Sequence, residues 1–346
     1  MEDIIRAGGG GEYMERKHWL KQVVEDIIDP QRPIIDPHHH LWRDKTVDDY
    51  QLADLWEDTD SGHNIIGTVF VECSADYRKE GPEALRPVGE TDFVSAEAEI
   101  SLTEMADGRP PILGIVSHAN LRLGDAVEEV IGAHLDAGKG RVKGIRHSAA
   151  YYPDPPAVDR YAGRVKHLLL DSDFRRGFAK LAPAGMSFDA WLLHTQIREL
   201  IDLAWTFPET TIIFDHFGGP LGIGPYKGKQ SEIYPRWKRD VADLAECDNV
   251  VAKLGGLAMM INGWGWDERE LPASSDDIVR AHQDYYLHMI DCFGPRRCMF
   301  ESNFPVDKVS VSYAVLWNAF KKIGRRFNQE ENGLLFEGTA KRVYRL

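Results

Sequence analysis

The chain has 346 residues, of which 43% are hydrophobic, and a formal net charge of −14 at pH 7. This surplus of negative charge disfavours binding to nucleic acid or to an anionic membrane surface, and no stretch approaches the ~20 apolar residues of a membrane span. The four cysteines stand apart without a CxxC pair, which is typical of free thiols in a reducing compartment. We therefore expect a cytoplasmic protein that binds a small molecule, with no nucleic-acid or membrane partner.

The chain begins with an extension, residues 1–32, that lacks the apolar segment of a secretory signal. Within it, a run of glycines is followed by residues 12–29, whose apolar side chains recur at helical spacing and predict an amphipathic helix. Residues 33–346 are expected to form one domain, because barrels of about 250 residues or more can fold as single units.

From residue 33 onward, short apolar runs alternate with amphipathic stretches. The runs that predict strands are 33–36, 64–73, 111–119, 141–148, 185–191, 210–216, 249–256 and 297–303. The stretches that predict helices are about 92–106, 123–138, 171–182, 194–207, 235–247, 276–293 and 308–326. This alternation predicts a parallel sheet, and eight strands are the number that closes a (β/α)8 TIM barrel. A doubly wound sheet is the alternative, but no GxGxxG follows the first strand.

The first strand ends in three consecutive histidines, at the barrel end where catalytic residues are found. Because side chains alternate between the two faces of a strand, Asp36, His38 and His40 are expected to share the inward face. His39 should then point outward, towards the helices. Two imidazoles on one inward face can hold one metal ion, whereas the alternative is a polar strand end without chemistry.

The sixth and eighth strands also end in residues suited to catalysis. His216 follows the apolar run IIFD, where a ligand or a base would be placed, although a hydrogen-bonded core histidine is the alternative. Asp215 precedes it and should face away from it. In the eighth run, Glu301 and Asn303 share one face and Ser302 takes the other. A buried glutamate is costly unless it is paired, metal-bound or protonated.

Charged side chains near other strand ends are candidates for substrate binding. The planar guanidinium of Arg146 suits a substrate carboxylate, and a structural ion pair is the alternative. Glu72, Lys253 and Asp189 stand near the ends of the second, seventh and fifth strands. His194 opens a predicted helix and could reach the mouth of the barrel. The histidines within predicted helices are expected at the surface; they include His134 and His282.

Taken together, these strand-end motifs resemble the amidohydrolase superfamily. The segments IIDPHHHLW (34–42), GIRH (144–147), IIFDHFGGPLG (212–222) and RCMFESNFPVDK (297–308) are similar to motifs of its amidohydrolase-related branch. That branch includes lactonases of the 2-pyrone-4,6-dicarboxylate and sugar-lactone type. The resemblance extends from about residue 33 to the C-terminus. It implies a (β/α)8 barrel that hydrolyses small esters, often lactones.

The resemblance also implies roles for individual residues. It matches His38 and His40 to the histidine pair of the first strand, His216 to the histidine of the sixth, and Arg146 to an arginine that binds a substrate carboxylate. Together with Glu301, the three histidines would hold a divalent ion, Zn²⁺ before others. Since members of this branch occur with and without a metal, a metal-free site stays open.

The eighth strand departs from the family pattern. Where the family has G-S-D-[WFY]-P, this chain reads ESNFP, so that the aspartate which usually takes the proton from water is Asn303. An amide cannot act as a general base. We therefore expect Glu301, two residues earlier on the same face, to accept the proton, or Glu72 if it lies closer.

The sequence thus predicts a hydrolase of a small carboxylated lactone or related ester, in which the histidines polarise the carbonyl directly or through a metal. A metal-dependent decarboxylase of an aromatic or enoic acid on the same barrel is the first alternative. A barrel that binds a small acid without turnover is the second. A homo-oligomer is compatible with each of these functions.

Overall fold

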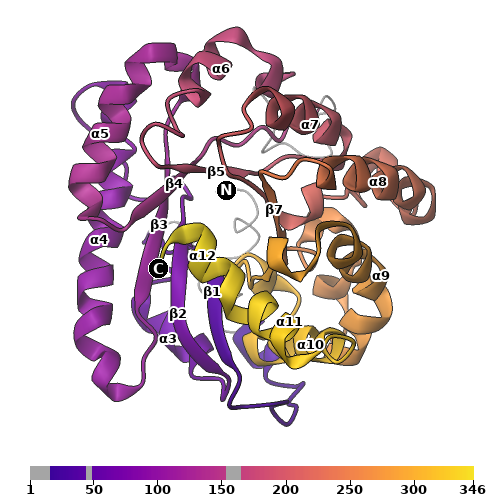
Figure 1. The fold of residues 1–346 in the computed structure, drawn as a ribbon. Helices are drawn as coiled ribbons and strands as arrows, with labels where there is room; N and C mark the ends of the chain where they lie inside the picture. The colour runs from indigo at the N-terminus through magenta and orange to yellow at the C-terminus, as the bar shows by residue number, and fades with distance from the viewer. Residues whose placement is uncertain (1–15, 44–48, 153–164) are drawn as a thin grey trace.

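The computed structural model describes residues 16–43, 49–152 and 165–346. Within these ranges the chain forms a parallel sheet in which each strand pairs with the next along the sequence (Figure 1). The strands are β1 (Pro33–His39), β2 (Asn64–Val71), β3 (Ile112–His118), β4 (Val142–Arg146), β5 (Ser187–Ala190), β6 (Ile212–Phe214), β7 (Val250–Leu254) and β8 (Cys298–Phe300). Seven predicted runs contain one of them, and β1 begins with the run 33–36 and continues to His39.

The sheet closes on itself between β8 and β1, immediately beyond the end of β8. The His40 amide donates a hydrogen bond to the Phe304 carbonyl (2.8 Å), and the Asn303 amide donates to the His38 carbonyl (3.0 Å). His39 and Phe304 also form a parallel bridge. These contacts complete the (β/α)8 TIM barrel that the sequence predicts.

Helices surround the barrel, as Figure 1 shows. They are α3 (Leu52–Thr59), α4 (Val88–Thr103), α5 (Val127–Gly138), α6 (Ser172–Phe178), α7 (Ile197–Thr206), α8 (Gln230–Ala245), α9 (Ser275–Phe293), α10 (Tyr313–Gly324), α11 (Gln329–Gly333) and α12 (Thr339–Tyr344). All seven predicted helices have a counterpart, whereas the short helices α3 and α11 lie outside the seven predicted stretches. Among the helices of the described ranges, none has both the length and the apolar character needed to cross a bilayer.

The interior of the barrel holds a core of its own. Side chains from the strands meet there with three from α12; the members are Ile35, Val69, Val71, Val116, Ile213, Val251, Met299, Ala340, Val343 and Tyr344. Lys143, near the start of β4, donates to the carbonyl of Arg345 just after α12 (3.3 Å). Helix α12 therefore closes the barrel at the N-terminal ends of its strands, opposite the end that carries the histidines.

The N-terminal segment differs from the predicted helix over 12–29. The first four of those residues lie outside the described ranges, residues 16–20 are helical, and residues 23–28 have no regular structure. The Glu25 carboxylate accepts a hydrogen bond from the Ser275 amide at the start of α9 (2.8 Å). Hydrogen bonds of this kind to the rest of the fold outweigh the weak helical preference of the segment.

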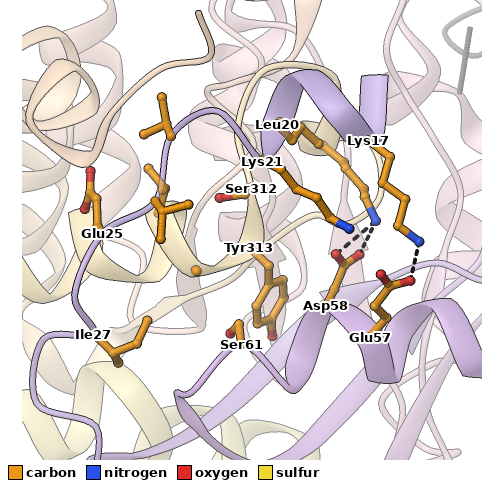
Figure 2. Close-up of a pocket in the computed structure, with 15 residues that line it drawn as sticks. Lys17, Leu20, Lys21, Glu25, Ile27, Glu57, Asp58, Ser61, Ser312 and Tyr313 are labelled. Atoms are coloured by element: carbon orange, nitrogen blue, oxygen red, sulfur yellow. Dashed lines mark hydrogen bonds and ion pairs between the residues drawn. The ribbon is translucent and has the colours of Figure 1, made fainter. Parts of the chain in front are cut away.

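The same segment lines an open pocket of about 310 Å³ with α3 and α10 (Figure 2). Two ion pairs lie along its rim. Lys308 Nζ donates to Asp58 Oδ2 (2.7 Å), and Lys17 pairs with Glu57. The segment is thus held against the outside of the barrel by polar contacts with α3 as well as by apolar packing.

Candidate active site

One buried carboxylate joins two histidines at the C-terminal end of the barrel. Glu301 follows β8 and has no exposed surface. Its Oε2 atom lies 2.8 Å from His38 Nδ1, and its Oε1 atom lies 2.7 Å from His216 Nδ1. Burial raises the pKa of Glu301 to about 8. An ionised Glu301 accepts the Nδ1 proton of His216 at Oε1, which leaves Nε2 of that ring available to a metal or a substrate. Oε2 lies beside His38 Nδ1 but has no hydrogen-bond partner among the described residues.

The three consecutive histidines take different positions. His40 Nδ1 lies 2.7 Å from the Val71 carbonyl, and its ring centroid is 4.9 Å from that of His38. The His39 ring instead packs edge-on against Phe70 on the outer side of the sheet, at 6.0 Å between centroids. Burial lowers the pKa of His39 to about 3, so the ring is neutral. His38 and His40 therefore face the barrel mouth, and His39 belongs to the packing between sheet and helices.

Asp36 does not share the face of His38, contrary to the prediction. Its Oδ1 atom accepts a hydrogen bond from the Ser302 amide (2.9 Å), and Oδ2 accepts from the hydroxyl of Tyr313 in α10 (2.9 Å). The pairing of β1 with β2 shifts register between Asp36 and His39. Because a bulge of this kind interrupts strict alternation, Asp36 points to the helices while His38 points into the barrel.

Asp215 was expected to face away from His216, and this expectation is wrong. Strand β6 ends at Phe214, and His216 has a φ of 53°, in the left-handed region. Alternation holds only within an extended strand, so the imidazole of His216 turns back to the side that Asp215 already faces. Neither carboxylate oxygen of Asp215 has a hydrogen-bond partner among the described residues, although both are buried.

Arg146 and Glu72, both expected to bind substrate, bind each other. Arg146 Nε donates to Glu72 Oε1 (2.8 Å), and the guanidinium also donates to the Glu72 carbonyl. Its NH1 atom lies 3.4 Å from His38 Nε2 and 3.8 Å from Asp215 Oδ2. Burial opposes the charge, but the carboxylates of Glu72 and Asp215 raise the pKa of Arg146. The guanidinium is therefore a fixed positive charge beside the histidines.

Lys253 is a second fixed positive charge, and it is fully buried. Its Nζ atom donates to Asp189 Oδ2 (2.7 Å) and lies 3.1 Å from His38 Nδ1. Asp215 Oδ1 and Glu301 Oε2 lie further away, at 3.5 Å and 3.9 Å. The structure thus places Lys253 within the barrel, among carboxylates, and not at a surface that a substrate would reach first.

Asn303 is held by a residue that the sequence did not single out. Its Nδ2 atom donates to Asp307 Oδ1 (2.8 Å), and the other oxygen of Asp307 accepts from the Ala258 amide (3.1 Å). Both Asn303 and Asp307 are buried. The only sequence signal for Asp307 was a carboxylate four residues after Asn303, which is too common to stand out. Asn303 therefore helps to fix the loop after β8.

His194 lies apart from the other candidates. Its Nδ1 atom accepts a hydrogen bond from the Leu221 amide (3.3 Å), and its ring packs edge-on against Tyr226. Leu221 belongs to an apolar cluster drawn from the loops after β4 to β8; its members are Ala150, Tyr152, Leu193, Leu221, Met259, Ile261 and Val306. Trp191 packs on this cluster and also contacts the His216 ring, at 5.1 Å between centroids. His194 thus belongs to the apolar rim of the site.

The side chains beside Glu301 fit a divalent cation. Ligand atoms of His38, Asp215 and His216 lie within 4.8 Å of one another. Nitrogen and oxygen donors of this kind suit Zn²⁺ among other ions. The surrounding ion pairs join two cations to four carboxylates; the members are Arg146, Lys253, Glu72, Asp189, Asp215 and Glu301. A divalent ion would offset the excess negative charge. The three candidate metal ligands thus include Asp215, which was not predicted as a ligand, and do not include His40 or Glu301, which were.

Comparisons with known proteins give matches that cover nearly the whole chain. A family model described as amidohydrolase matches residues 35–346. The chain is 31% identical over 327 residues to uncharacterized protein y4mH of Sinorhizobium fredii, covering 90% of this chain and 98% of the relative. It is 26% identical over 324 residues to L-fucono-1,5-lactonase of Burkholderia multivorans, covering 90% and 96%.

Among solved structures, an amidohydrolase from Burkholderia multivorans with bound zinc superposes with a TM-score of 0.70 at 22% identity. The match covers 90% of this chain and 99% of that one, and it shows the same barrel. The family model spans the strand ends that carry the histidines and Glu301. The chain therefore belongs to the amidohydrolase family of hydrolases, in its lactonase-like branch.

Proposed function

We propose that this hydrolase opens a small lactone or a related ester by adding water to the carbonyl group. The observation that carries the proposal is the arrangement around Glu301. This carboxylate lies 2.7–2.8 Å from the Nδ1 atoms of two histidines, and beside them Asp215 has oxygens without hydrogen-bond partners in the described ranges. Lactone hydrolysis needs a polarised carbonyl, a base for the attacking water, and a proton for the leaving oxygen. The site offers a group for each task.

Asp215 is the best-placed base. Glu72 is bound to Arg146, and Glu301 Oε1 is hydrogen-bonded to His216 Nδ1. Glu301 Oε2 has no hydrogen-bond partner in the described ranges, but it lies 2.8 Å from His38 Nδ1, which leaves little room for a water molecule. Asp215 has two buried oxygens without hydrogen-bond partners in the described ranges. One oxygen can orient the water and take its proton, and the same carboxyl can return that proton to the leaving oxygen. The geometry thus favours Asp215 over Glu301 in this role.

The cations and the histidines stabilise the negative charge that develops on the carbonyl oxygen. Arg146 NH1 stands beside His38 Nε2, and its position is fixed before substrate arrives, so little reorganisation is needed during the reaction. A divalent ion held by His38, Asp215 and His216 would polarise the carbonyl as a Lewis acid. Zn²⁺ is the first candidate, because a structurally similar amidohydrolase contains zinc.

The substrate class has two sources of support. Similarity to an L-fucono-1,5-lactonase favours a sugar lactone. Arg146 favours a substrate with a carboxylate, but its guanidinium already binds Glu72 and faces Asp215. An added carboxylate would therefore meet an ion pair instead of a free cation. Sugar lactones and carboxylated lactones are the two sets of compounds to compare.

Replacing Asp215 by asparagine tests the assigned base. We expect Asp215→Asn to lower kcat for lactone hydrolysis by roughly 10²–10⁴, the usual contribution of a positioned base. Glu129→Gln, at an exposed position of α5, serves as the matched control and should leave kcat unchanged. Acid release would be followed with both sets of lactones, on protein of measured metal content.

Three outcomes would contradict parts of the proposal. Full activity in Asp215→Asn would remove Asp215 as the base. Release of carbon dioxide from aromatic or enoic acids, without lactone hydrolysis, would identify a decarboxylase. Folded, metal-loaded protein that binds small acids and turns over none of the compounds would identify a binding protein.

A further inference from the structure

A hydrogen-bond chain runs from α12 through the middle of the barrel to the histidines. In Figure 1 the yellow helix α12 lies in front of β1, inside the ring of outer helices. Tyr344, its last residue, is fully buried in the barrel interior. Its hydroxyl donates to Asp189 Oδ2 (2.7 Å). The same oxygen accepts from Lys253 Nζ (2.7 Å), which lies 3.1 Å from His38 Nδ1.

Asp189 depends on these two donors. Its other oxygen, Oδ1, is buried without a hydrogen-bond partner in the described part of the chain. The hydroxyl of Tyr344 therefore supplies part of the stabilisation that a buried carboxylate needs, and Lys253 supplies the rest. The Tyr344 ring also faces Lys253 Nζ at 5.4 Å from its centroid.

Lys253 is shared among several acceptors. Asp189 is the nearest carboxylate, and Asp215 and Glu301 lie 0.8 Å and 1.2 Å further away (3.5 and 3.9 Å against 2.7 Å). When the Tyr344 hydroxyl is removed, Lys253 is the remaining hydrogen-bond donor to Asp189 Oδ2, so it binds Asp189 more strongly. The contacts of the ammonium group with His38 and Glu301 would then weaken.

We propose that Tyr344 is a positioning residue, which sets where Lys253 stands relative to His38 and Glu301 and thereby tunes the site from the opposite end of the barrel. This inference rests on the proposed function only where it concerns turnover. A residue that merely fills the barrel would act through its ring, whereas a positioning residue acts through its hydroxyl.

Tyr344→Phe separates these two roles, since it keeps the ring and removes the oxygen. Tyr50→Phe is the matched control, because the Tyr50 hydroxyl also donates to a carboxylate, Asp58, at 2.7 Å but away from the histidines. We expect Tyr344→Phe to lower kcat about tenfold with KM changed less than about twofold, as for the loss of one hydrogen bond to a charged group. Tyr50→Phe should change neither.

A second readout does not require a known substrate. In protein with ¹⁵N-labelled histidine, Tyr344→Phe should shift the ring resonances of His38 and leave those of His39 in place. If no lactone is turned over, the proposed function fails while this measurement still tests the position of Lys253. If Tyr344→Phe does not fold, Asp189→Asn serves instead, because it weakens the same contact with Lys253. Unchanged His38 resonances in a folded variant would overturn the inference.

Discussion

A single glycine keeps His216 in its place. Gly256 has a φ of 78°, and a Cβ atom at this position would lie 2.4 Å from His216 Nδ1. That nitrogen lies 2.7 Å from Glu301 Oε1, so any displacement of the ring also disturbs the pairing with Glu301. This position therefore requires glycine for two reasons: its backbone is left-handed, and there is no space for a side chain.

Gly256→Ala should damage the site more than the fold. Gly81 is the matched control, since its φ of 85° is similar but no atom lies within 4 Å of a Cβ built there. We expect Gly81→Ala to lower the free energy of unfolding by about 1–2 kcal/mol, the strain of a left-handed residue, with kcat unchanged. Gly256→Ala should show that strain and also lose roughly 10²-fold in kcat. Urea unfolding and lactone hydrolysis measure the two effects, and equal kcat values would contradict the steric argument.

Some site residues are predictable from their position at the ends of apolar runs, and others are not. His38, His216 and Glu301 stand where short apolar runs end, and the structure brings them together. Asp215 was missed because alternation was counted past the end of β6, where the backbone is no longer extended. Tyr344 could not be found, because its partner Asp189 is 155 residues away and only the folded barrel brings them together.

Secondary structure was predictable wherever hydrophobic periodicity is strong. The eight strands and seven of the helices have that periodicity, and each strand pairs with the next along the chain. The N-terminal segment also has apolar residues at helical spacing, but its backbone follows contacts with α9 and α10 instead. Helix α3 is only 8 residues long, which is too short for its pattern to separate it from a loop.

The contact between α4, α5 and β3 contains a histidine that was expected at the surface. His134 lies on α5 and is fully buried. Its Nδ1 atom lies 2.8 Å from the hydroxyl of Thr91 on α4, and its Nε2 atom lies 2.9 Å from the carbonyl of His118 at the end of β3. Helical periodicity places residues on faces, but it cannot tell that a polar residue will find partners in the interior.

This contact should make stability depend on pH. Burial lowers the pKa of His134 to about 4, whereas an unfolded chain binds the proton near pH 6.5. Protonation therefore favours the unfolded state, and stability should fall as the pH drops from about 6.5 towards 4. Between pH 7.5 and pH 5 the loss should be about 2 kcal/mol. His134→Gln should remove this part of the pH dependence in urea unfolding; an unchanged slope would exclude His134 as its source.

The whole molecule separates its two barrel ends by function. Apolar loops surround the end that carries the histidines, and α12 closes the other. Between them lies a buried network of cations and carboxylates within a chain whose net charge is −14. The barrel walls keep this network away from water, where its ion pairs would be weaker.

The stability of the site depends on the seam between β8 and β1, where the barrel closes. Hydrogen bonds across this seam join backbone atoms of His38, His40, Asn303 and Phe304. These residues directly flank the site. The ladder of hydrogen bonds between β8 and β1 is shorter than the one between β2 and β3. Short ladders open more readily than long ones. Peptides covering 36–42 and 300–306 should therefore exchange amide hydrogens faster than those covering 66–71 and 112–117. On warming, lactone hydrolysis should fail while the rest of the barrel is still folded, and equal protection of both regions would contradict this order of events.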